Sequence, residues 1–148
     1  MPKAEGGISP RGANLPHMHL IAYADGASRG NPGPAAYGAV LCDLDGEELD
    51  AWGNPIGRAT NNVAEYHGAI AAVEAALERG ATELELRLDS ELIVRQLEGR
   101  YRVKNKQLKP LFDQLSALID RLDSFQPTHV RRHLNQRADA MANEALDR

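Results

Sequence analysis

The order of strand-like and helix-like segments constrains the fold of this 148-residue chain more than any other feature. Three strand-like segments come first, and a turn with Gly46 joins the last two as a hairpin; they lie at residues 19–25, 36–42 and 47–56. Strands and helices then alternate, with strands expected at 82–89 and 125–132 and helices at Asn62–Arg79, Ser90–Leu97, 105–122 and Asn135–Leu146.

This order, βββαβααβα, predicts an α/β fold with one five-stranded mixed sheet and helices packed on it. Hairpins join antiparallel strands, whereas the later strands need helical crossovers and therefore run parallel. The length is typical of a single domain, which we place at residues 19–148. Residues 1–18 are rich in Gly, Pro and polar residues and lack the apolar region of a signal peptide, so we interpret them as a disordered tail.

Composition excludes several classes of protein. No apolar run is long enough to cross a bilayer, so we expect no membrane partner. The single cysteine, Cys42, rules out an internal disulfide and a multi-cysteine zinc site, and it indicates a reducing, cytoplasmic compartment. Its apolar neighbours predict a buried, inert thiol. The net charge of −4 means that a nucleic acid would have to be held by a local basic patch or by bound cations.

Four acidic residues fall near the junctions of predicted strands and helices. Asp25 ends the first strand and Asp89 the fourth, while Glu65 and Asp139 lie in first turns of helices. Each has an ordinary structural explanation. Asp25 can form an Asx-turn, Glu65 a capping box with Asn62, and Asp89 can cap the next helix. Asp139 can interact with the helix dipole.

Taken together, the four acids predict a metal site. Ligand sites in open α/β sheets form at the carboxyl ends of strands, and Asp25 and Asp89 meet there if their strands are parallel neighbours. Converging carboxylates repel one another unless cations hold them, and Mg²⁺ prefers such oxygen ligands. Two such ions can clamp the attacking and leaving oxygens of a phosphodiester.

The acids lie in four motifs that together resemble the type 1 ribonuclease H family. In chain order the motifs are DGASRGNPGPAAYG, TNNVAEYHGAIAAVEAAL, LDS (88–90) and VRRHLNQRADAMANEA (130–145), and the resemblance extends from about residue 19 to 146. The resemblance implies a ribonuclease H-like fold and an endonuclease that cleaves the RNA strand of RNA–DNA hybrids. It also implies two Mg²⁺ or Mn²⁺ ions, carried by Asp25, Glu65, Asp89 and Asp139.

The resemblance further implies substrate contacts. His133 takes the place of a histidine that assists proton transfer or product release, and Arg132 beside it is an alternative for that role. Thr60 matches a contact to a DNA phosphate. The positions expected to bind the hybrid are Gly26, Ser28, Gly30, Asn31, Thr60, Asn61, Asn62 and Arg132.

The glycine- and proline-rich turn after the first strand fits this interpretation. Gly26 and Gly30 have no Cβ, so we expect a nucleic-acid backbone to come close there, while Pro32 and Pro34 restrict the loop to one shape. Family resemblance places RNA 2′-hydroxyls beside this turn, and this group distinguishes RNA from DNA.

The chain departs from the family pattern in three places. Only the five residues LNQRA separate His133 from Asp139, no hybrid-binding module precedes residue 19, and EGRYRVKNK stands where a long basic handle is expected. Residues 100–109 carry five basic residues and no acid, which predicts either phosphate contact or a solvated surface.

Two other functions remain open at this point. One is a catalytically silent hybrid-binding module, and the other is a different two-metal nuclease, such as a resolvase or a 3′–5′ exonuclease. The NNxxE helix and the GNPG turn favour the ribonuclease, and we expect it to act as a monomer.

Overall fold

The computed structural model describes residues 17–148, so nearly all of the tail predicted at residues 1–18 lies outside the described residues. A single five-stranded sheet has the order β3-β2-β1-β4-β5. The three N-terminal strands pair antiparallel and the other two extend the sheet in parallel; they are β1 (His19–Ser28), β2 (Gly33–Cys42), β3 (Glu48–Ala59), β4 (Glu83–Leu88) and β5 (Ser124–His129). The predicted mixed sheet is confirmed.

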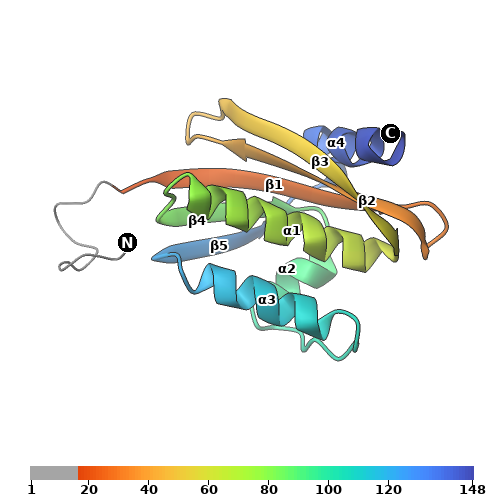
Figure 1. The fold of residues 1–148 in the computed structure, drawn as a ribbon. Helices are drawn as coiled ribbons and strands as arrows, with labels where there is room; N and C mark the ends of the chain where they lie inside the picture. Colours follow the sequence, from red (N-terminus) through yellow and green to blue (C-terminus); the bar gives the residue numbers. More distant parts are fainter. Residues whose placement is uncertain (1–16) are drawn as a thin grey trace.

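Helices cover both faces of the sheet (Figure 1). On one side α1 (Asn61–Glu78) and α2 (Glu91–Leu97) pack on the sheet and α3 (Lys109–Ile119) packs against α1. Helix α4 (Gln136–Leu146) packs on the other face against β1, β2 and β3. Side chains of successive residues in β1 point to opposite faces of the sheet. Leu20 and Ala22 join the larger core beneath α1, while Ile21 contributes to a smaller cluster with Ala138 of α4.

Several boundaries differ from those predicted, each for a local reason. Strand β1 continues to Ser28 because β2 stays paired with it beyond Asp25, so Asp25 lies within the strand and not at its end. Helix α3 begins at Lys109 instead of residue 105, because the Asn105 side chain accepts hydrogen bonds from the backbone N–H groups of Gln107 and Leu108 and forms a turn.

The C-terminal part of the chain contains one more element than the sequence predicts. Strand β5 ends at His129, and a short 3₁₀ helix, η2 (Arg132–Leu134), precedes α4. Cys42 is buried, as predicted, and burial raises the pKa of its thiol. Among residues 17–148, none of the helices combines the length and apolar character needed to cross a membrane.

Candidate active site

The sheet brings Asp25 and Asp89 to the same place. Strands β1 and β4 pair in parallel from His19 opposite Glu83 to Tyr23 opposite Arg87. Two residues further on, the same register puts Asp25 opposite Asp89, just where the ladder between the two strands has ended. The first two acids therefore project at the point where β1 and β4 separate.

Glycine brings α1 and its glutamate against β1. A Cβ on Gly26 would lie only 2.3 Å from the backbone nitrogen of Glu65, so no larger residue fits without moving the helix. The structure adds a reason for glycine at residue 26 that the sequence does not indicate, and the expected contact with a nucleic-acid backbone stays a prediction. The close approach at Gly26 is to the backbone of α1, and it places Glu65 beside Asp25.

A second glycine positions α4 at the same level of the sheet. Gly38 is the cross-strand partner of Asp25, and a Cβ there would lie 2.1 Å from the carbonyl oxygen of Ala138. Helix α4 therefore packs directly on β2 with Asp139, in its first turn, beside the other acids. Two tight helix–strand contacts, at Gly26 and Gly38, thus fix where Glu65 and Asp139 lie.

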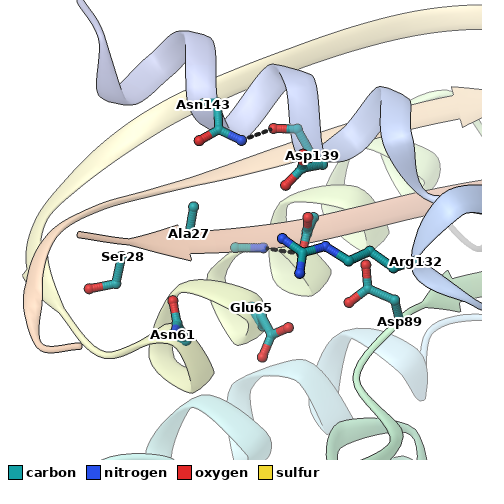
Figure 2. A pocket seen from close by; sticks show the side chains of 10 residues that line it. Ala27, Ser28, Asn61, Glu65, Asp89, Arg132, Asp139 and Asn143 are labelled. Atoms are coloured by element: carbon teal, nitrogen blue, oxygen red, sulfur yellow. Dashed lines mark hydrogen bonds between the residues drawn. The ribbon is translucent and has the colours of Figure 1, made fainter. Parts of the chain in front are cut away.

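The four acids line one pocket of about 600 Å³, which we call the carboxylate pocket. Carboxylate oxygens of Asp25, Glu65 and Asp89 lie within 4.8 Å of one another. Figure 2 shows Glu65, Asp89 and Asp139 directed toward a common space, with the guanidinium of Arg132 reaching into it. These hard oxygen donors, gathered in one open pocket, are the kind of ligand that Mg²⁺ prefers, so they fit a divalent cation.

Electrostatics in the pocket also favour a cation. Burial, followed by repulsion from Asp89, a hydrogen bond with Asp139 and repulsion from Glu65, raises the pKa of Asp25 to about 8, and the Gly26 N–H opposes this rise only in part. Burial and then repulsion from Asp89 raise the pKa of Glu65 to about 7. Without a cation, protons must neutralise these groups near neutral pH.

The ordinary structural explanations of two acids prove wrong. Helix α1 is capped by Thr60, whose Oγ1 accepts a hydrogen bond from the backbone N–H of Val63, so Glu65 takes no part in a capping box. Helix α2 is capped by Ser90, not by Asp89. Neither carboxylate is needed to cap the start of a helix, and both line the pocket.

A second, polar pocket of about 310 Å³ adjoins the first, and Asn61 lines both. It gathers four of the predicted hybrid-binding positions, together with three uncharged residues of the basic segment 100–109; the lining comprises Asn31, Thr60, Asn61, Asn62, Asn105, Gln107 and Leu108. The Asn31 side chain accepts a hydrogen bond of 2.9 Å from the backbone N–H of Asn61, which ties the turn after β1 to the start of α1. We call this second cavity the amide pocket.

The other predicted positions divide between the carboxylate pocket and the surface. Gly26, Ser28 and Arg132 line the carboxylate pocket, although the Ser28 hydroxyl donates to the carbonyl of Ala59. Gly30 lines neither pocket. Its φ of +106° is a backbone conformation that favours glycine in the turn after β1. His133 is exposed on the 3₁₀ helix and lines neither pocket.

Sequence reasoning missed three further residues of the carboxylate pocket and its support. Ala27 and Asn143 line the cavity, and Asn143 donates a hydrogen bond of 3.0 Å to the carbonyl of Asp139 one helical turn before it. The sequence could have indicated Asn143, because residues four apart on a helix lie on the same face. Asn135 is buried behind Asp89, and nothing in the local sequence marks it except its place before a helix.

The basic residues at 100–109 adjoin the amide pocket through Asn105 and Gln107. Within residues 17–148, the exposed side chains of Arg102, Lys104 and Lys106 form no ion pair. These three residues present positive charge beside a cavity lined with amides.

Comparison with known proteins agrees with this geometry. The reverse transcriptase-like family matches residues 23–145. Ribonuclease HI of Halobacterium salinarum is 51% identical over 85% of this chain, and a bifunctional protein of Mycobacterium tuberculosis is 46% identical over 88%. The chain spans 63% of the halobacterial protein and 36% of the mycobacterial one.

Solved structures show the same likeness. The crystal structure of the halobacterial RNase H1 superposes with a TM-score of 0.85 at 50% identity, covering 87% of this chain and 98% of the other. LC11-RNase H1, solved in complex with an RNA/DNA hybrid, gives a TM-score of 0.83 at 43% identity, with 86% and 96% covered. By the sequence match, the shared fold and the four assembled motifs, the chain belongs to the type 1 ribonuclease H family.

Proposed function

We propose that the protein is an endoribonuclease that hydrolyses the RNA strand of RNA–DNA hybrids with two divalent ions, Mg²⁺ or Mn²⁺. One observation carries the proposal: carboxylate oxygens of Asp25, Glu65 and Asp89 lie within 4.8 Å of one another, in an open pocket that Asp139 completes. The hybrid bound to LC11-RNase H1 supports the choice of substrate.

All four acids have the same task in this proposal. The carboxylates of Asp25, Glu65, Asp89 and Asp139 would hold the ions, with Asp25 the most deeply buried of the four. Bound ions would supply an activated water and stabilise the leaving oxygen. Burial and repulsion raise the pKa values of Asp25 and Glu65, so a bound cation would favour the ionised form of both carboxylates.

The neighbouring surfaces select the substrate. Backbone and side chains at Gly26, Ser28 and Asn61 border the carboxylate pocket and can contact 2′-hydroxyls of the RNA strand. The amide pocket offers uncharged donors at Thr60 and Asn31 for a phosphate of the DNA strand. Asn61 lines both pockets, which couples the position of one strand to that of the other.

His133 and Arg132 have auxiliary roles in this proposal. Arg132 lines the pocket and supplies positive charge to the bound phosphodiester. The exposed His133 transfers a proton or assists product release from the 3₁₀ helix after β5. The catalytic domain comprises residues 19–148, and we propose that it acts as a monomer in the cytoplasm.

A nuclease assay tests the proposal. An end-labelled RNA–DNA hybrid is incubated with Mg²⁺, Mn²⁺ or EDTA, alongside double-stranded DNA, double-stranded RNA and single-stranded RNA. We expect internal cuts in the RNA of the hybrid alone, with none in EDTA. Products shortened only from one end would indicate an exonuclease, and hybrid binding without cleavage would indicate a silent binding module.

A further inference from the structure

Asn135 is a buried polar residue beside the four acids, and the proposed function does not explain it. Its side chain is about 1% exposed and lies just before α4, yet it makes no capping hydrogen bond to that helix. Its amide nitrogen instead donates two hydrogen bonds away from α4. One, of 2.9 Å, goes to the carbonyl oxygen of Ala24, and the other, of 3.1 Å, goes to Oδ2 of Asp89.

These two acceptors lie on the two strands that separate at the carboxylate pocket. The parallel ladder of β1 and β4 ends at Tyr23 and Arg87, so the carbonyl of Ala24 points to where a strand partner would continue. The Asn135 amide takes the place of that partner. It joins the backbone immediately before Asp25 to the carboxylate of Asp89, and so spans the gap between the two acids.

The orientation of the amide is fixed by its partners. A flipped side chain would place Oδ1 against the carbonyl of Ala24 and the carboxylate of Asp89, where three oxygens would repel. In the orientation present, Oδ1 is buried and has no hydrogen-bond partner among the described residues. Burying an unpaired acceptor is unfavourable for folding, so stability alone does not account for an asparagine here.

We infer that Asn135 is a positioning residue for the metal site: its amide fixes the carboxylate of Asp89 relative to Asp25 in the geometry that binds a divalent cation. An aspartate could not donate either hydrogen bond, and an apolar residue would leave both acceptors unpaired. The inference rests on the proposed metal-binding role of Asp89. Hydrogen bonds that orient a ligand commonly change metal affinity by about 10- to 100-fold.

Metal binding, not cleavage, provides the test. Mn²⁺ is titrated into the full chain and followed by electron paramagnetic resonance, for the wild type, Asn135→Ala, Asp89→Asn and the double variant. We expect Asn135→Ala to weaken Mn²⁺ binding about tenfold in the wild-type background. In the Asp89→Asn background we expect less than about a twofold effect, because the asparagine acts through Asp89.

A matched control separates positioning from stability. Thr82 is buried at the opposite end of β4, where its hydroxyl hydrogen-bonds to the backbone of Met18. Thr82→Val removes buried hydrogen bonds and should lower the melting temperature without changing Mn²⁺ affinity. Should Asn135→Ala not fold, Asn135→Ser, which keeps one donor, takes its place in the cycle.

The outcomes distinguish the two proposals. If the wild type binds Mn²⁺ but Asn135→Ala weakens binding equally with and without Asp89, or not at all, the positioning role is wrong and the metal site stands. If the wild type fails to bind Mn²⁺, both the inference and the proposed function are overturned.

Discussion

At the scale of single residues, the pKa of Asp25 is raised further above its ordinary value than that of Glu65 beside it. The Asp25 pKa of about 8 lies far above the value of roughly 3.9 expected in the unfolded chain. Between about pH 4 and pH 8 the folded, metal-free protein therefore binds more protons than the unfolded chain does. Without metal, the Asp25 carboxyl therefore lowers the free energy of unfolding as pH rises through that window.

Asp25→Asn keeps the shape of the side chain and removes the charge. In EDTA at pH 8.5 we expect the variant to be more stable than the wild type by about 2 kcal/mol, with the difference vanishing near pH 4. Urea denaturation at both pH values measures it. The same variant should lose hybrid cleavage, since a metal ligand is gone. Equal pH dependence of stability in the two proteins would mean that burial and the neighbouring acids do not raise the pKa of Asp25 in the folded protein.

The neighbouring residues His133 and Arg132 make a second test at this scale. We expect His133→Ala to lower kcat about tenfold and to alter its pH dependence, with KM nearly constant. Arg132→Ala should mainly raise KM, because its charge contacts substrate in ground and transition states alike. The two variants are compared from pH 6 to pH 9. Loss of kcat in Arg132→Ala alone would assign the auxiliary role to the positive charge of the arginine.

At the scale of elements, the site depends on how closely two helices approach the sheet. Gly26→Ala places a methyl group 2.3 Å from the Glu65 nitrogen, so α1 must shift. We expect a loss of about 2 kcal/mol in stability and a larger loss in cleavage, because Glu65 moves from Asp25. Gly57→Ala is the control: its Cβ meets nothing within 4 Å, and its φ of +80° alone costs about 1 kcal/mol. Full activity in Gly26→Ala would show that the contact does not position Glu65.

Element order and the acid positions are accessible from the sequence, and contacts between distant segments are not. The alternation of strands and helices predicts the sheet, because hydrophobic period and turn chemistry are local. The burial of Asn135 depends on where the β1–β4 ladder ends, which no local pattern specifies. The turn motif marks Gly26, but no local pattern shows that α1, some forty residues away in the chain, packs against it.

At the scale of the whole molecule, a basic segment lies beside the pockets although the net charge of the chain is negative. The net charge is −4, and the acids concentrate negative charge in the carboxylate pocket. The segment with Arg102, Lys104 and Lys106 lies beyond the amide pocket, where it can meet a nucleic-acid backbone that passes both cavities. Bound cations would reverse the sign of the carboxylate pocket, so the substrate would meet positive charge along its whole path.

Reversing these three charges together tests that arrangement. Arg102→Glu, Lys104→Glu and Lys106→Glu should raise KM for the hybrid with little change in kcat, because phosphate contacts contribute uniform binding. The plot of log KM against log salt concentration should flatten by a slope of about 2 to 3, roughly one for each phosphate that is no longer neutralised. Arg79→Glu with Arg121→Glu is the control: these exposed residues follow the C-terminal ends of α1 and α3, away from the pockets. An unchanged salt slope in the triple variant would make the segment a solvated surface and leave the amide pocket to hold the DNA strand without it.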